Sequence, residues 1–463
     1  MVDANLKVAD VFRTTGQPTI TYVPRDSGHY EGRLNGHLNE KGQLCLITGP
    51  SKTGKSTLYK RVLEERRQIP LVVQCTAEKR CIDIWREALS SVNFEQVKST
   101  SAGGSTKISG TVEVGAKLGW AWLSEVTGKL LGSIGHELNE ATIRERFIAD
   151  PSPELLIPVL KNTNYVLVIE DFHYLSDREK VLLFQQWKRF VDNEVTILVL
   201  GTTHRAIDIA SSNKDLIGRI AQIDIAQWES SDLKKIVRQG FDYLGLKIDS
   251  DAAEKICVEA VGLPIIVQQV CLQILNNLKV EIAQDIVGRK IKKIDISMVV
   301  ESFTDVANNK YSLFGTYYKT LIRGPKEKNR KYKTYELILA CFNMDPITFS
   351  MTRSEVNARL AKMKLANEEK PPAASLNSTF GALRKFQDKR NFQLLEWMAN
   401  EDSLYIVEPS FLFYVRWRIN REKNIGIQLD LFESLLEEMR NIDFGSTVIR
   451  KFSRRIAARD DLT

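Results

Sequence analysis

The sequence lacks any apolar run long enough to cross a membrane. A spanning helix needs about 18 consecutive apolar residues, and none of the 463 residues belongs to such a run. The first residues, MVDANLKVADVF, also lack the basic and then apolar regions of a secretory signal. We therefore expect a cytoplasmic protein with no membrane span.

Cysteine and histidine are both scarce, with six and five residues. The cysteines lie inside apolar runs without CxxC pairs, and the histidines are not spaced as metal ligands. Disulfides and transition-metal sites are therefore not expected. The sequence also lacks the motifs that accompany a serine or cysteine nucleophile in hydrolases.

The composition is that of a folded protein, with 43% apolar and 27% charged residues. A chain of this length exceeds what one hydrophobic core usually holds, so two or three domains are expected. The net charge of +7 lies mostly in residues 301–463, which contain 27 Lys and Arg against 21 Asp and Glu. Any contact with a polyanion is therefore expected in the C-terminal third.

Four apolar runs at 44–49, 70–75, 165–170 and 195–201 alternate with segments long enough for helices. This is the pattern of an α/β core, a parallel sheet between helices. A segment rich in Gly and Ser at 98–140 interrupts the rhythm and is predicted to be an insertion. Its alternating apolar residues favour a strand or hairpin packed on the protein's own core over an element that contacts a membrane or another subunit.

The segment GPSKTGKS fits the phosphate-loop motif G-x-x-x-x-G-K-[ST], with an apolar strand before it and a helical pattern after it. Glycines permit a tight loop whose N–H groups point at phosphate oxygens, and the following helix adds the positive end of its dipole. A lysine neutralises the β- and γ-phosphates, and a serine hydroxyl suits Mg²⁺. The predicted ATP-binding residues are Gly49, Pro50, Ser51, Lys52, Thr53, Gly54, Lys55, Ser56 and Thr57.

An acidic pair follows the strand YVLVI. Such a pair can hold the Mg²⁺ and polarise the attacking water. We predict that Glu170 and Ser56 coordinate the metal and that Asp171 polarises the attacking water. Because Asp is shorter than Glu, hydrolysis is expected to be slow.

Around these motifs, from about Tyr22 to Leu275, the chain resembles the AAA+ and STAND classes of P-loop ATPases. It is most similar to initiator-like ATPases that end in a winged helix. In ILVLGTTHR, the resemblance implies that Thr203 or His204, with Arg205 close behind, senses the γ-phosphate. Arg219 stands where such ATPases often carry an arginine that reaches a neighbour's nucleotide, with a solvated or paired arginine as the alternative.

The segment VGLPIIVQQVC is similar to the GLPLAL-type segment of STAND proteins, which implies that Pro264 packs by the adenine. Relatives contact the adenine base with a segment near their N-terminus. The matching positions here are Tyr22, Val23 and Arg25, which are therefore candidates for the adenine pocket. A lid arginine of the sensor-2 kind has no match. That difference favours a nucleotide switch over a processive motor.

Helical patterns fill residues 229–305 and predict a helical lid. Beyond a basic linker, three helical segments and a hairpin at 394–397 and 404–409 predict a winged helix, with a capping box at Thr352 and Glu355. An apolar stripe of Leu376, Phe380, Leu383 and Phe386 leaves a basic face on the third helix. Its candidate DNA contacts are Arg384, Lys385, Lys389 and Arg390.

The expected division of the chain is a lead at 1–40, a P-loop core at 41–228, a lid at 229–305, a linker at 306–335, a winged helix at 336–420, and C-terminal helices with a basic tail at 421–463. Two functions remain open. The first is an ATP-driven, Mg²⁺-dependent switch that forms homo-oligomers and engages DNA. The second is a STAND-type signalling or defence switch whose winged helix and insertion contact an unknown protein partner.

Overall fold

The computed structural model describes residues 3–92, 148–202, 218–225, 227–325, 332–363, 365 and 369–418. The chain divides into two compact units. The core unit consists of Pro24–Gly49 and Gly54–Ala226, and the C-terminal unit consists of Met1–Val23, Pro50–Thr53 and Gln227–Thr463. The expected insertion at 98–140 and the segment 421–463 lie outside the described residues.

A parallel five-stranded sheet lies at the centre of the core unit, in the order β2-β3-β4-β1-β5. The strands are β1 (Leu44–Thr48), β2 (Ile69–Gln74), β3 (Tyr165–Glu170), β4 (Ile197–Leu200) and β5 (Ile220–Asp224). Since side chains alternate along a strand, the inner strands β1, β3 and β4 face two apolar layers. The α/β prediction is confirmed, with β1 to β4 at the four apolar runs.

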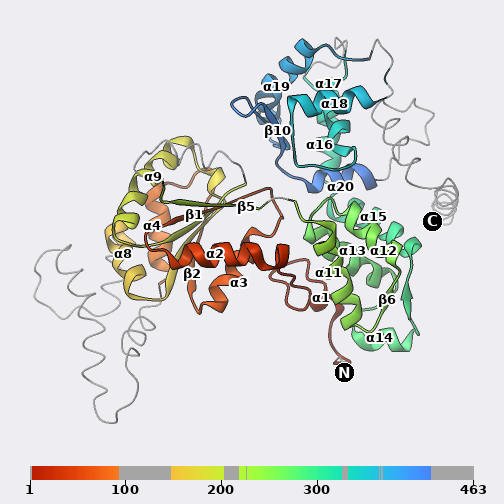
Figure 1. Ribbon diagram of the computed structural model, residues 1–463, viewed down its shortest axis with the longest axis horizontal. Helices are drawn as coiled ribbons and strands as arrows, with labels where there is room; N and C mark the ends of the chain where they lie inside the picture. Colours follow the sequence, from red (N-terminus) through yellow and green to blue (C-terminus); the bar gives the residue numbers. More distant parts are fainter. Residues whose placement is uncertain are drawn as a thin grey trace, which may run out of the picture. The chain divides into compact units, whose positions relative to one another are not determined.

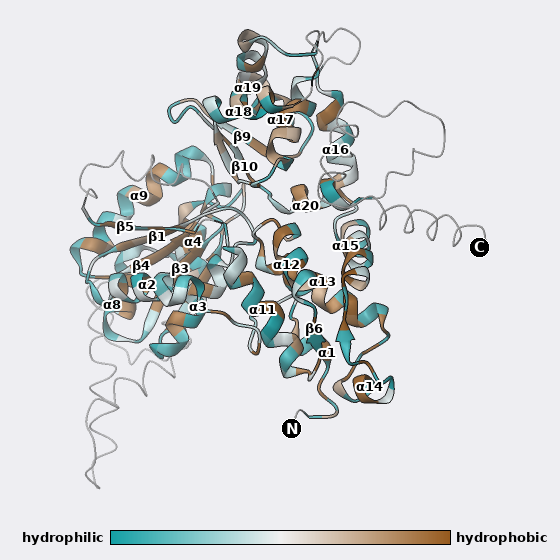
Figure 2. Ribbon diagram, turned by 45° about the vertical axis from the view of Figure 1, so that its right-hand side comes forward, coloured by the Kyte–Doolittle hydropathy of each residue, from teal (hydrophilic) through white to brown (hydrophobic). Residues whose placement is uncertain are grey.

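Two sets of helices cover the sheet (Figure 1). One face packs against α2 (His29–Asn39) and α3 (Lys55–Glu65). The other packs against α4 (Cys81–Ser90), α8 (Pro153–Asn162) and α9 (Asp177–Asp192). Burial on both faces explains why the inner strands are continuous apolar runs, which appear brown in Figure 2.

Strand β5 was not predicted as a strand. It lies at the edge of the sheet and alternates buried Ala221 and Ile223 with the more exposed Gln222 and Asp224. Only one row of its side chains enters the core. Its sequence therefore lacks the apolar run that identified the inner strands.

The C-terminal unit contains the predicted helical lid. Its helices are α1 (Val8–Val11), α11 (Ser230–Tyr243), α12 (Ser250–Glu259), α13 (Pro264–Asn277), α14 (Ala283–Gly288) and α15 (Ile296–Lys310). A short parallel pair, β6 (Lys247–Ile248) and β7 (Lys293–Ile294), accompanies them. Phe12 packs on Gly240, where a Cβ atom would lie 2.2 Å from the phenyl ring. The N-terminal segment thus shares the lid's apolar core.

The winged helix is confirmed in the same unit. It comprises α17 (Thr334–Asn343), β8 (Ser350–Thr352), α18 (Arg353–Lys362), α19 (Ala373–Asp388), β9 (Leu395–Met398) and β10 (Ser403–Ile406), with sheet order β8-β10-β9. The capping box at Thr352 and Glu355 begins α18. The segment expected as a basic linker, 306–335, contains α16 (Phe314–Arg323), and α20 (Ser410–Trp417) follows the hairpin.

All six cysteines are buried as free thiols. Cys45, Cys75 and Cys81 lie in the core unit, and Cys257, Cys271 and Cys341 lie in the C-terminal unit. Burial raises the pKa of each thiol. None of the helices in the described part of the chain combines the length and the apolar character that a membrane span requires.

Candidate nucleotide site

The predicted phosphate loop joins the end of β1 to the start of α3. Gly49 and Gly54 have φ angles of 139° and 97°, which L side chains rarely adopt. At Gly49 a Cβ atom would also lie 2.3 Å from the carbonyl oxygen of Ile225. Both glycines are therefore required by the backbone path itself.

Side chains of the loop fold back on its carbonyl groups. The Lys55 Nζ atom donates to the carbonyl oxygen of Gly49 at 2.8 Å, and the Thr53 hydroxyl donates to the carbonyl oxygen of Pro50 at 2.9 Å. Ser51 and Thr57 are partly exposed. Because α3 begins at Lys55, the N–H groups of its first turn lack carbonyl partners within the helix. The start of α3 can therefore receive an anion.

Ser56 and Glu170 lie together, although 114 positions separate them. The Ser56 hydroxyl donates to Glu170 Oε1 at 2.7 Å, from the first turn of α3 to the end of β3. A hydroxyl and a carboxylate are hard oxygen ligands of the kind that Mg²⁺ prefers. The pair lies beside a glycine loop that connects a parallel strand to the start of a helix. This is the arrangement that binds nucleotide phosphates.

The chain has the P-loop NTPase fold. In the P-loop site, Tyr59 lies one turn beyond Ser56, fully buried. Burial raises the pKa of its hydroxyl, and the negative charge of Glu170 raises it further. The phenol therefore stays protonated next to the carboxylate that is expected to hold Mg²⁺.

Asp171 follows Glu170 in a left-handed backbone conformation, with φ 57°. Its Oδ2 atom accepts a hydrogen bond from Gln74 Nε2 at 3.0 Å, from the end of the neighbouring strand β2. Glu170 and Asp171 therefore have separate partners. The sequence did not predict Gln74 as part of the site, because the contact joins residues 97 positions apart.

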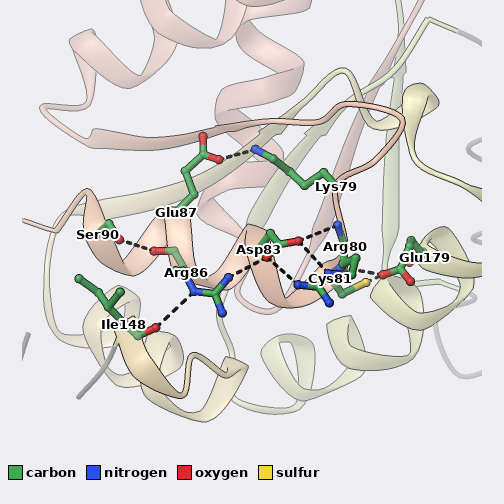
Figure 3. Close-up of polar contacts among 9 residues, drawn as sticks. All are labelled: Lys79, Arg80, Cys81, Asp83, Arg86, Glu87, Ser90, Ile148 and Glu179. Carbon is green, nitrogen blue, oxygen red and sulfur yellow. Dashed lines mark hydrogen bonds and ion pairs between the residues drawn. The ribbon is translucent and has the colours of Figure 1, made fainter. Parts of the chain in front are cut away.

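A polar network at the start of α4 holds the end of β2. Lys79 Nζ donates to the carbonyl oxygen of Gln74 at 2.6 Å and pairs with Glu87 on α4. Figure 3 shows that ion pair, with Arg80 and Arg86 both reaching Asp83. These charges fix α4 against the strand that positions Gln74.

His173, in the short 3₁₀ helix η2 (Phe172–Tyr174), also lies near this site. Burial lowers the pKa of His173 to about 4, and the positive charge of Lys55 acts in the same direction, although Asp171 opposes both. The imidazole is therefore neutral at physiological pH. It can contribute packing and a hydrogen bond, but no positive charge.

The predicted phosphate sensors Thr203, His204 and Arg205 lie outside the described residues. Thr202, the last described residue after β4, has a buried hydroxyl without a hydrogen-bond partner in the described part of the chain. Strand β4 lies between β1 and β3 in the sheet. A polar group at its end is therefore close to both the P-loop strand and the acidic strand.

Arg219 precedes β5 and lies at the amino end of the parallel strands, whereas the phosphate loop follows the carboxyl end of β1. Its carbonyl oxygen accepts from the N–H of Leu44, the first residue of β1, whereas the P-loop follows the last residue of β1. A five-residue strand spans about 16 Å. Its guanidinium pairs with Asp192 at 3.2 Å, and both side chains are half exposed. Arg219 is thus not part of its own subunit's phosphate site.

The predicted adenine-side residues lie in two places. Pro264 opens α13 after a turn in which Val261 and Gly262 have positive φ angles. Val23 is buried in the lid core, and Tyr22 is partly exposed. Arg25, in η1 (Arg25–Gly28) of the core unit, lies over the ring of Tyr30, with 4.6 Å from Cζ to the centroid.

Sequence reasoning missed Trp228, which contacts the P-loop within the C-terminal unit. Its indole N–H donates to the carbonyl oxygen of Thr53 at 2.8 Å, and its backbone N–H donates to Gly262. The loop is thereby linked to the turn before Pro264. A lone Trp in a polar segment gives no sequence signal for such a link.

The basic face predicted on α19 is exposed. Leu376, Phe380, Leu383 and Phe386 are buried, as the stripe required. The four candidate DNA contacts are exposed: Arg384, Lys385, Lys389 and Arg390. Arg384 pairs with Asp388 at 3.8 Å, and Arg390 lies 5.8 Å from the ring centroid of Phe386.

Comparison with solved structures gives remote similarities. A Walker-type ATPase of Pyrococcus abyssi is 14% identical, with a TM-score of 0.47, over 88% of this chain and 99% of the other. Cdc6p of Pyrobaculum aerophilum is 13% identical, with a TM-score of 0.37, over 94% and 98%. The Orc1 protein of Aeropyrum pernix, in complex with DNA, is 11% identical, with a TM-score of 0.39, over 88% and 94%. Neither a protein-family model nor a curated protein sequence matches the chain.

Proposed function

We propose that the protein is a Mg²⁺-dependent ATPase that acts as a conformational switch, self-assembles and engages DNA through α19. The observation that carries the ATPase proposal is the 2.7 Å contact between Ser56 and Glu170 beside the glycine loop. A Mg²⁺ bound to nucleotide phosphates needs both oxygens.

In this proposal each residue of the site has one task. Backbone N–H groups of the loop and the ammonium of Lys55 bind the phosphates, while Ser56 and Glu170 hold the Mg²⁺. The metal ion would neutralise charge that develops on the transferring phosphoryl group. Asp171 would orient the attacking water, and its partner Gln74 fixes the carboxylate that does so.

The DNA part of the proposal is supported by exposed positive charge. Lys385 on α19 is exposed, and so are Lys389 and Arg390, which follow the last residue of that helix, Asp388. Cations on one helix can contact backbone phosphates of a duplex, and arginine can also read guanine. Homo-oligomers are proposed because Arg219 is separated from its own phosphate site by the length of β1.

A second function is a STAND-type signalling or defence switch that contacts a protein partner and no DNA. The observation that favours it is the pairing of Arg384 with Asp388, which offsets one of the four candidate charges. The two functions differ in a measurable property. Salt-sensitive binding to a duplex supports the first, and nucleotide-dependent binding of a protein partner without duplex binding supports the second.

Thermal unfolding tests the nucleotide site. A ligand that binds only the folded state, at about 100 times its Kd, stabilises it by about 2.7 kcal/mol. We expect ATP with Mg²⁺ to raise the Tm, and Lys55→Ala to remove most of that rise. Lys60→Ala is the matched control, because it removes the same charge from the same helix. If Lys55→Ala folds normally and retains the full rise, the proposed site is wrong.

A further inference from the structure

Lys52, in the phosphate loop, does not direct its ammonium at the loop. Its Nζ atom lies 3.1 Å from Glu408 Oε1 and 3.1 Å from Ser410 Oγ, two residues beside the start of α20. All three residues belong to the C-terminal unit. The contact joins positions 356 residues apart, between a residue predicted to bind nucleotide and the segment that follows the hairpin of the winged helix.

The surroundings of this ammonium are complementary to its charge. Nζ also lies 5.5 Å from the ring centroid of Tyr311, which follows the end of α15. The Ser410 hydroxyl donates to Glu408 Oε1 at 2.5 Å, and this orients the carboxylate. Burial raises the pKa of Tyr311, as does the charge of Glu408 to a lesser degree, so the ring stays neutral. An ammonium has three N–H donors, and a carboxylate, a hydroxyl and a ring face now surround them.

Nucleotide phosphates and Glu408 would compete for this ammonium. A triphosphate bound to the loop would bring negative charge to Lys52, whose ammonium lies 3.1 Å from the Glu408 carboxylate. Two anions beside one ammonium repel each other, so a phosphate at Lys52 favours the departure of Glu408. The side chains of Lys52 and Glu408 are 36% and 22% exposed, so solvent already reaches the pair. Lys52 also has a positive φ of 64°, a backbone conformation that a rearranged loop can relax.

We propose that Glu408 and Ser410 form an autoinhibitory latch on Lys52, which holds the start of α20 against the phosphate loop until a nucleotide triphosphate displaces it. The inference rests on the proposed function and assigns a regulatory contact to the same site. Nucleotide and Glu408 compete for Lys52, and such coupling is reciprocal. Nucleotide binding weakens the latch by a certain factor, and the latch weakens nucleotide binding by the same factor.

A double-mutant cycle tests the latch. ATP·Mg²⁺ binding is measured by calorimetry for the full chain, Glu408→Gln, Lys52→Gln and the double variant. We expect Glu408→Gln to lower the Kd about three- to fivefold, the size expected of a partly exposed ion pair. In the Lys52→Gln background, Glu408→Gln should leave the Kd unchanged. Glu401→Gln, which removes the same charge from the hydrogen-bond partner of Tyr405, should also leave it unchanged.

Hydrogen exchange of the amides of Ser410–Trp417 gives a second readout. ATP should speed exchange there in the unmodified chain, and Lys52→Gln should remove that response. The latch is overturned if Glu408→Gln leaves both the Kd and the exchange unchanged, or if it lowers the Kd equally in both backgrounds. Failure of the proposed function would give a different result. The unmodified chain would then show no ATP binding that depends on Lys55.

Discussion

The amide of Gln74 donates to Asp171 at 3.0 Å, while Glu170 accepts from Ser56 at 2.7 Å. Two adjacent acids therefore receive hydrogen bonds from different elements, one from β2 and one from α3. Asp171 itself has a left-handed backbone conformation. Each carboxylate therefore has its own hydrogen-bond donor, Ser56 for Glu170 and Gln74 for Asp171.

Replacing Gln74 should separate catalysis from binding. Gln74→Leu keeps the size of the side chain but leaves the Asp171 carboxylate without its donor. We expect ATP turnover to fall about tenfold, because a misdirected base loses its alignment with the attacking water, while ATP affinity stays the same. Phosphate release and calorimetry measure the two quantities. Gln43→Leu, which removes an amide that bonds Glu40 at the amino end of β1, is the control.

Acid should destabilise the C-terminal unit through Glu259. Burial alone would raise the pKa of this carboxyl group, but Arg416 and Lys255 outweigh it and lower the pKa to about 2. Arg416 and Trp417 of α20 bond the carboxylate at 2.8 Å each. A depressed folded-state pKa adds stability above the unfolded value of about 4.5. That stability is lost as the pH falls from about 4.5 towards 2.

Urea unfolding between pH 7 and pH 3 checks this. At pH 7 we expect Glu259→Gln to lower the free energy of unfolding by about 3 kcal/mol, since it leaves buried cations without their anion. The variant should then lose less stability than the unmodified chain as the pH falls. Glu254→Gln, on the same helix but half exposed in its pair with Lys234, should change the pH profile much less than Glu259→Gln does. Parallel pH profiles for the Glu259→Gln and unmodified chains would contradict the assignment.

The basic face of α19 should determine duplex binding. Replacing Lys385, Lys389 and Arg390 by Ala is expected to weaken binding and to reduce the slope of log K against log salt by about 0.9 for each phosphate that the variant no longer neutralises. ATP binding should be unaffected. Arg289, Lys290 and Lys292, exposed basic residues of the lid region, provide a control triple with equal loss of charge. An unchanged slope in the α19 variant would favour the signalling switch.

Arg219 should act on a neighbouring copy. An exposed ion pair such as Arg219 with Asp192 is worth at most about 1 kcal/mol, so exchange for a phosphate is feasible. Arg219→Ala is expected to bind ATP but to lose about 10³-fold in turnover. Mixing it with Lys55→Ala should restore activity, since one variant keeps the pocket and the other keeps the arginine. Arg189→Ala, which breaks the exposed pair with Glu154, should remain active. An inactive mixture of demonstrably co-assembled variants would leave Arg219 a structural residue.

Local patterns in the sequence were sufficient for much of the fold. The strands β1, β3 and β4 are buried on both faces and therefore appear as apolar runs, and a glycine loop followed by Lys55 and Ser56 has a clear spacing. The basic residues of segment 306–335 predict a linker, but Tyr318 and Leu321 are buried in it on helix α16. Edge strand β5 was missed because only one row of its side chains is apolar.

Contacts between distant positions could not be predicted in the same way. Gln74 with Asp171, Trp228 with Thr53 and Lys52 with Glu408 each join different elements of the chain. Neither periodicity nor charge patterning contains information about such pairs. The chemistry of each residue type was visible in the sequence, but its partner is determined only by the folded chain.

The distribution of the six buried thiols provides a probe of opening for each unit separately. A thiol reagent reacts with thiolate, and buried cysteines with raised pKa values react only after the surrounding structure has opened. Three cysteines lie in each unit, so mass spectrometry of labelled peptides would time the opening of the two units independently in one sample. Added nucleotide should slow labelling of Cys45, which lies in the strand that leads into the glycine loop. The native sequence thus provides reporters on both units without any introduced label.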